Sequence, residues 1–165
     1  MKKIFLVAVI WMMGLTACFE PPVMQPDLKG AKLPSFDLLL LDSTTKYNTA
    51  KFDDSKPLVL LYLSPDCPYC RAQTEAIIRD MRTLKDIQFC LFTVAPLMQF
   101  RSFYKEYQLG KYPNITAGVD YDDFFGKHFN VPGVPYMAIY DSRKRLKEVL
   151  IGQVDVTRIR DISQN

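Results

Sequence analysis

Two cysteines separated by two residues, Cys67 and Cys70, are the side chains of this sequence best suited to chemistry. They stand in the run Ser-Pro-Asp-Cys-Pro-Tyr-Cys-Arg at residues 64–71. A thiolate attacks disulfides, and a second thiol one helical turn away can resolve the mixed disulfide. The spacing therefore predicts dithiol–disulfide exchange, in which Cys67 attacks and Cys70 closes the Cys67–Cys70 disulfide.

The flanking segments place this pair where a buried strand turns into a helix. Residues 58–63 are a short apolar run typical of a fully buried strand. After the cysteines, apolar residues recur at helical spacing from Ile77 to Leu84. Cys67 then lies at or just before the helix N-terminus, where unpaired N–H groups and the dipole favour an anion. Pro68 fits the first helical turn, because its missing N–H costs nothing there.

A purely structural disulfide or a zinc site fits the pair less well. A structural disulfide of this size would close a very small loop and stabilise little. A zinc site needs about four ligands, and besides the pair the folded part offers only Cys90 and His128. We therefore predict no metal and no cofactor. Cys90 is expected to be a small buried hydrophobe, with a third redox thiol as the alternative, and His128 a surface or satisfied residue.

The stretch from residue 33 to residue 70 resembles the thioredoxin-like superfamily, specifically the extracytoplasmic, membrane-anchored thiol–disulfide oxidoreductases related to the alkyl hydroperoxide reductase and thiol-specific antioxidant group. The matching parts are Leu-Pro-Ser-Phe-Asp-Leu at 33–38, Lys-Pro-Leu-Val-Leu at 56–60, Cys-Pro-Tyr-Cys at 67–70 and Val-Pro-Gly-Val-Pro at 131–135. The resemblance implies a cis bond before Pro135, packed against the cysteines. It also implies that the Val134 backbone pairs with an extended substrate segment. Val134, Pro135, Pro68 and Tyr69 are thus the expected substrate-binding residues.

Two departures from the resembled family bear on the redox potential. Asp66 stands where relatives usually carry Trp, and a carboxylate beside Cys67 opposes thiolate formation. Leu61 stands where many relatives carry a polar or acidic residue, so no carboxylate is available there to handle protons. A less stabilised thiolate predicts a potential nearer thioredoxin than a strong oxidase. The resemblance likewise favours the reducing direction.

The order of the remaining segments predicts an α/β sandwich, with a central mixed β-sheet flanked by helices and an added N-terminal β-hairpin. The resemblance implies that this is the thioredoxin-like fold. The hairpin is expected at 35–47, a second buried strand at 87–94, a short strand at 115–119, and an antiparallel pair at 136–140 and 146–151. Aromatic residues at helical spacing predict a helix over 100–107 that Gly110 ends. Short helices are expected near 120–129 and 156–162. The active site lies at the C-terminal end of the first core strand.

The N-terminal residues predict export and lipid anchoring. Residues 1–17 combine Lys2-Lys3 with an apolar stretch too short for a confident membrane span, as in a signal peptide. They end in Leu-Thr-Ala before Cys18, which resembles the lipobox of bacterial lipoproteins and implies lipidation of Cys18. Residues 18–32, rich in proline, are expected to be a lipidated tether, and 33–165 the thioredoxin-like domain. The protein is then anchored to a bacterial membrane and faces the periplasm, with the outer membrane preferred because Phe19 follows the cysteine.

Composition restricts the partners. The net charge is +3, and Lys2 and Lys3 supply two of those charges, so nothing indicates nucleic-acid binding. The expected partners are protein thiols and disulfides, and the resemblance implies an integral-membrane thiol carrier that donates electrons. Two alternatives remain open: a redox-inactive or copper-handling binding protein of the same fold, with His128 as a ligand, and a peroxidase, for which the context of Cys67 is a poor match.

Overall fold

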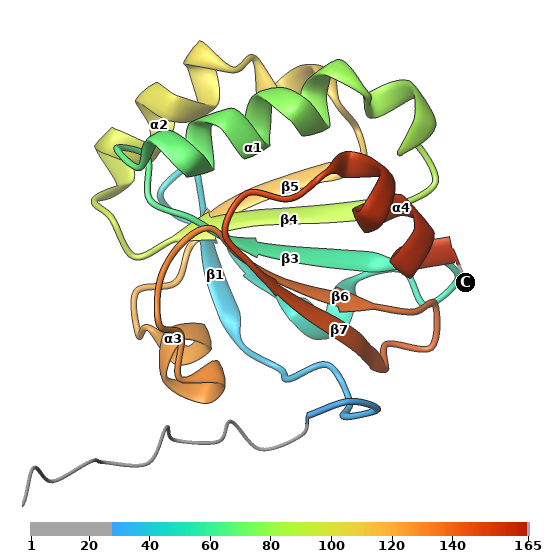
Figure 1. Cartoon of the computed structure of the whole chain (residues 1–165). Helices are drawn as coiled ribbons and strands as arrows, with labels where there is room; N and C mark the ends of the chain where they lie inside the picture. The colour runs from blue at the N-terminus through green and yellow to red at the C-terminus, as the bar shows by residue number, and fades with distance from the viewer. Residues whose placement is uncertain (1–27, 165) are drawn as a thin grey trace, which may run out of the picture.

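The apolar runs of the sequence form the middle of a seven-stranded sheet in the computed structural model, which describes residues 28–164 (Figure 1). Strands β3 (Leu58–Tyr62), β4 (Gln88–Thr93) and β5 (Ile115–Val119) run parallel to one another. All five residues of β3 are buried, as a strand covered on both faces requires. The predicted buried strands around the cysteine motif are therefore confirmed.

Antiparallel strands extend this parallel centre on both sides. Strand β6 (Tyr136–Tyr140) pairs with β3, and β7 (Leu146–Ile151) pairs with β6. On the other side, β1 (Asp37–Leu40) and β2 (Lys46–Asn48) form a hairpin whose first strand pairs with β5. The strand order is β2-β1-β5-β4-β3-β6-β7. This confirms the mixed sheet and the added N-terminal hairpin.

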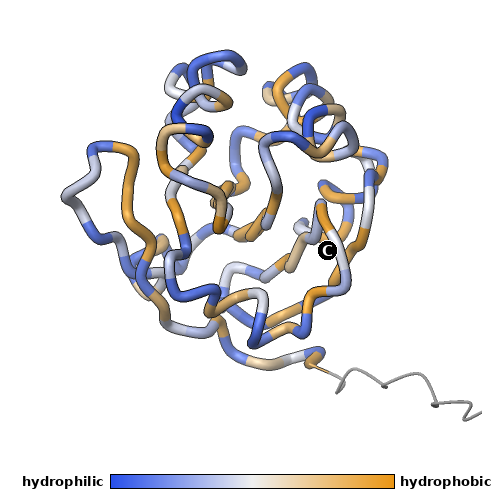
Figure 2. The backbone as a smooth tube through the Cα atoms, turned by 90° about the vertical axis from the view of Figure 1, so that its left-hand side faces the viewer, coloured by the Kyte–Doolittle hydropathy of each residue, from blue (hydrophilic) through white to orange (hydrophobic). Residues whose placement is uncertain are grey.

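Helices cover both faces of the sheet, and each face has its own buried cluster. On one face, here called the α1 face, lie α1 (Pro68–Arg79), α2 (Leu97–Glu106) and α4 (Val156–Gln164), packed on residues such as Val59 and Leu91. On the opposite α3 face, α3 (Phe124–Phe129) packs with Phe36 and Phe52 on residues such as Leu60. Hydrophilic and hydrophobic residues alternate along the helices in Figure 2, as amphipathic helices require. Three short 3-10 turns complete the chain: η1 (Thr49–Lys51), η2 (Met81–Thr83) and η3 (Leu109–Lys111).

The aromatic helix ends earlier than predicted, and Gly110 does not end it. Helix α2 stops at Glu106, and Gln108 adopts the left-handed conformation, with φ of 50°. Gly110 lies inside η3, where an added Cβ would approach the Tyr104 hydroxyl to 3.0 Å. A non-glycine residue thus makes the turn after α2, and Gly110 packs closely against the Tyr104 side chain of that helix.

Residues 28–32, predicted to be part of the tether, lie against the sheet. The Gly30 N–H donates to the Leu146 carbonyl at 2.8 Å, and the Leu146 N–H donates to the Ala31 carbonyl at 2.8 Å. Lys32 forms an antiparallel bridge with Arg145. The predicted signal peptide, Cys18 and the rest of the tether fall outside the described residues. Within residues 28–164, no helix combines the length and apolar character needed to cross a membrane.

Candidate active site

Cys67 is the N-cap residue of α1. Its backbone is extended, with φ of −75° and ψ of 119°, and its carbonyl accepts the Arg71 N–H at 3.0 Å. The Cys67 N–H donates to the Ser64 carbonyl at 3.1 Å, which closes the turn between β3 and the helix. Pro68 occupies the first turn of the helix, as the sequence predicts. Cys67 therefore lies at the positive end of the α1 dipole.

The two cysteines differ sharply in exposure. Cys67 is half-buried, whereas Cys70 is fully buried in the cluster of the α1 face. The Ser64 N–H donates to the Cys70 Sγ atom at 3.5 Å. Burial raises the pKa of Cys70 to about 12, with a smaller raising effect from Cys67, and the Ser64 N–H only partly offsets this. Cys67 is thus the thiol open to a partner, and Cys70 is the protected thiol behind it.

The loop before β6 brings a backbone carbonyl to the exposed thiol. The Cys67 Sγ atom donates to the Val134 carbonyl oxygen at 3.7 Å. The bond between Val134 and Pro135 is cis, as the resemblance implied. The Pro135 carbonyl accepts the Gly152 N–H at 2.8 Å, which joins this loop to the end of β7. Cys67 and Val134 are 67 residues apart in the chain, yet the two segments that resemble the family meet at one sulfur atom.

Exposed apolar side chains lie on the same edge of the sheet. Tyr69, between the cysteines, is 63% exposed, and Pro68 is also exposed. Val94 follows β4 and Met98 lies in the first turn of α2, and both are exposed. Because the carboxyl ends of parallel strands share one edge, these residues surround the exit of β3, where Cys67 stands.

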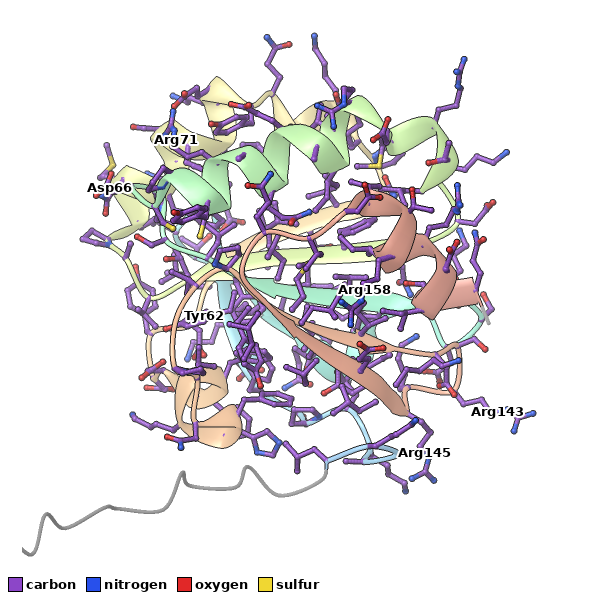
Figure 3. The ribbon with its side chains drawn as sticks, in the orientation of Figure 1. Tyr62, Asp66, Arg71, Arg143, Arg145 and Arg158 are labelled. Carbon is purple, nitrogen blue, oxygen red and sulfur yellow. The ribbon has the colours of Figure 1, made fainter. Side chains whose placement is uncertain are left out.

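Two polar residues beside the motif are held by α2, which the sequence alone did not show. The Asp66 carboxylate is exposed and accepts a hydrogen bond from the Gln99 side-chain amide. Arg71 forms an ion pair with Glu106, and its guanidinium also donates to the Pro65 carbonyl at 3.2 Å. Figure 3 shows Asp66 and Arg71 together at the N-terminal end of α1. These contacts tie the turn that carries Cys67 to a helix more than 30 residues later, a separation that no local pattern reveals.

The remaining candidate residues lie elsewhere. Leu61 is fully buried in the same cluster as Cys70. Cys90 is fully buried on the α3 face, and burial raises the pKa of its thiol. His128 is exposed on α3 and stacks on Phe124, with ring centroids 5.4 Å apart. Among residues 28–164, no three His, Cys, Asp or Glu side chains group closely enough to hold a metal ion.

Comparison with solved structures shows a thioredoxin-like fold. A secreted disulfide oxidoreductase from Mycobacterium tuberculosis, homologous to Escherichia coli DsbE, superposes with a TM-score of 0.64 at 21% identity, covering 77% of this chain and 92% of that chain. StoA from Bacillus subtilis gives 0.59 at 10% identity, covering 78% and 96%. The reduced 2-Cys peroxiredoxin of Plasmodium vivax gives 0.66 at 17% identity, covering 83% and 80%. A comparison with curated proteins gave no match.

The family follows from the sequence match. The model of the Redoxin family matches residues 28–163, and the chain therefore belongs to that family. The Cys67–Cys70 pair of this Redoxin-family chain fits a C-x-x-C active site. The match begins at residue 28, the first residue described, in agreement with the contacts of residues 28–32 with the sheet.

Proposed function

We propose that this protein exchanges disulfides with protein substrates outside the cytoplasm, in the reducing direction, while anchored to a bacterial membrane through Cys18. One observation carries the chemistry: a half-buried Cys67 thiol at a helix N-terminus, in front of a fully buried Cys70. The exposed apolar rim around Cys67, with Tyr69 and Met98, supports a protein partner, because apolar contact is the main source of protein–protein affinity.

The reaction balances as two successive sulfur exchanges. The Cys67 thiolate attacks one sulfur of a substrate disulfide, forms a mixed disulfide and releases the first substrate thiolate. Cys70 then loses its proton and attacks the Cys67 sulfur, which releases the second substrate thiolate. The substrate disulfide gains two electrons, and Cys67 and Cys70 become a disulfide. Two protons from the dithiol end on the substrate thiols.

The environment of the pair supports this assignment of roles. Cys70 is shielded from solvent, so only Cys67 meets an incoming disulfide. In the mixed disulfide, Cys67 no longer carries a thiol, and its raising effect on the pKa of Cys70 disappears. Since Leu61 is an alkyl side chain, that position offers no carboxylate to accept the Cys70 proton. The substrate thiolate released in the first exchange can take up the Cys70 proton instead.

The substrate is proposed to lie along the loop before β6. The Val134 carbonyl already faces the Cys67 sulfur, 3.7 Å away. A substrate segment in extended conformation can pair with this backbone as an added strand, with Pro135, Pro68 and Tyr69 as flanking contacts. This mode of binding uses hydrogen bonds to the substrate backbone rather than to its side chains, so it suits a range of protein substrates.

The direction depends on the potential of the pair and on an electron source. In an oxidising compartment, a dithiol acts as a reductase only when a donor re-reduces it. We assign that role to an integral-membrane thiol carrier. Equilibration of the Cys67–Cys70 pair with glutathione buffers, followed by thiol alkylation and mass analysis, measures the potential. We expect a potential nearer that of thioredoxin, about −270 mV. A potential of about −120 mV would instead make the protein a disulfide donor.

A further inference from the structure

A cluster of exposed cations lies around the turn between β6 and β7. Arg143 and Arg145 belong to this turn, and Lys32 is bridged to Arg145 through the backbone. All three side chains are exposed, and none of them forms an ion pair within residues 28–164. Arg71 and Arg158, by contrast, are each paired with a glutamate. We call Lys32, Arg143 and Arg145 the cationic end.

The cationic end surrounds a pocket of about 220 Å³. Leu33 and Phe52 contribute apolar surface to it, and Asp54 contributes a single carboxylate. The buried Lys144 also lines the pocket, and the Asp53 and Asp141 carboxylates act on it beside Asp54. The four cations therefore outnumber the nearby carboxylates by one, and the three exposed cations face the solvent. Its volume is several times the roughly 30 Å³ that one water molecule occupies in the liquid, so it has room for a phosphate-sized group.

The backbone beneath the cationic end is well fixed. Lys144 lies between the two arginines with φ of 56° and is buried, and its ammonium donates to the Asp53 and Lys56 carbonyl oxygens. The Leu33 N–H donates to the Lys144 carbonyl at 2.9 Å. The Arg145 guanidinium donates to the Gly30 carbonyl at 3.3 Å. The turn, the entry segment and the loop before β3 thus fix the backbone that carries the three cations.

The chain enters the described structure at this same end. Only a few residues separate Leu28 from Lys32, and the intervening backbone is bonded to the turn. Residues 18–27, about ten in number, span at most about 35 Å when fully extended. A lipid on Cys18 therefore keeps the cationic end within about 35 Å of the bilayer surface. The tether allows it to come within the Debye length of about 8 Å over which anionic headgroups attract basic residues.

The active site lies at the opposite end of the sheet. Lys144 binds the Lys56 carbonyl just before β3 begins, whereas Cys67 follows the other end of β3. Figure 3 shows Arg143 and Arg145 on one side of the molecule, and Asp66 and Arg71 on the far side. A surface that contacts the cationic end leaves the Cys67 thiol facing away from it.

We propose that the cationic end docks on anionic phospholipid headgroups of the membrane that carries the protein. This inference rests on the lipid anchoring at Cys18 proposed above. Lys32, Arg143 and Arg145 contact the phosphates, and the pocket between them accepts one headgroup. Docking orients the domain, so that Cys67 and its apolar rim point into the compartment and meet protein substrates.

The test compares two kinds of vesicle. The full chain with its lipid is reconstituted into vesicles of phosphatidylcholine alone, or with about one third phosphatidylglycerol, and amide hydrogen exchange is followed by mass spectrometry. We expect exchange in residues 28–33 and 141–147 to slow by about threefold or more in the anionic vesicles. We expect this difference to vanish at about 0.5 M salt. Equal exchange in both vesicles overturns the proposal, as does slowing confined to residues 94–100 near the active site.

Variants and a soluble anion separate the remaining possibilities. The double variant Arg143→Ser/Arg145→Ser is expected to show the same amide exchange in anionic and neutral vesicles. The control Lys105→Ser/Lys111→Ser removes two exposed charges from another part of the surface and should keep the slower exchange in anionic vesicles. Inorganic phosphate with neutral vesicles should not reproduce the slowing; if it does, the pocket is a soluble-anion site and the docking proposal fails. A chain that stays with neither vesicle also overturns it. Disulfide exchange should be unchanged in both double variants, so loss of docking is distinguishable from loss of the proposed activity.

Discussion

The Cys67 sulfur lies 3.7 Å from the carbonyl oxygen of Val134, so the proposed nucleophile is in contact with the backbone proposed to pair with substrate. The two residues reach this point from different strands, β3 and β6, which are antiparallel neighbours in the sheet. The end of β3 and the start of β6 therefore lie side by side, and the motif and the loop before Pro135 meet there.

The first prediction concerns the roles of the three cysteines in residues 28–164. Cys67→Ser should abolish reduction of a model disulfide, because no other thiol in these residues is exposed to it. Cys70→Ser should retain the attack and accumulate a mixed disulfide, because the resolving thiol is gone. Gel mobility under non-reducing conditions detects that species. Cys90→Ser is the matched control and should keep full activity, and exchange that survives in Cys67→Ser would contradict the assignment.

The second prediction concerns Asp66. Removing its exposed carboxylate with Asp66→Asn should stabilise the neighbouring thiolate and so favour the reduced pair. The potential should rise by about 10–20 mV, which corresponds to an exposed charge interaction of under about 1 kcal/mol. Equilibration with glutathione buffers measures the shift. Asp86→Asn, an exposed carboxylate remote from the motif, should leave the potential unchanged. A fall in potential for Asp66→Asn would show that its bond to Gln99 governs the site instead.

The third prediction follows from the raised pKa of Cys70. The pKa of Cys70 is about 12 in the folded protein and about 8.5 in the unfolded chain. Between these pH values the folded protein keeps the Cys70 proton, whereas the unfolded chain loses it. The contribution of Cys70 to the stability of the reduced protein is fully present below about pH 8.5. It is lost as the pH rises toward about 12. Denaturant unfolding of reduced wild type and Cys70→Ser, measured from about pH 8 to about pH 11, should show a steeper loss for the wild type. Parallel curves for the two proteins would refute this.

The fourth prediction concerns the seam between the hairpin and the parallel strands. Gly118 on β5 has no room for a side chain, because an added Cβ would lie 3.0 Å from both the Leu38 Cβ and the Leu39 carbonyl oxygen. Gly118→Ala should cost about 1–3 kcal/mol of unfolding free energy. Gly133→Ala, where an added Cβ meets nothing within 4 Å, should stay within about 0.5 kcal/mol. Similar losses in both variants would argue against close contact at the seam.

The sequence predicts the elements that carry the site because their signals are local. The apolar run of β3, the proline after Cys67 and the turn residues of the hairpin each act within a few positions, and the structure confirms all three. Gly110 shows the weakness of such signals, since glycine favours a helix end but does not require one. Gln108 accepts the left-handed conformation instead.

The contacts that the sequence does not reveal join distant segments. The Asp66–Gln99 and Arg71–Glu106 pairs span 33 and 35 residues, and they depend on how α2 packs beside α1. The docking of residues 28–32 on the β6–β7 turn spans 115 residues between Gly30 and Arg145. The lysine and glycine residues of this segment are locally typical of a linker, and its backbone finds hydrogen-bond partners only because the β6–β7 turn lies beside it.

Because Cys90 is fully buried on the α3 face, the reactivity of its thiol shows whether the protein is folded. The sheet lies between this thiol and the Cys67–Cys70 pair, so thiol scrambling among the three requires the sheet to open. An alkylating reagent that reaches Cys90 in the oxidised protein therefore counts molecules that have unfolded, while the redox state of the pair is read independently in the same sample.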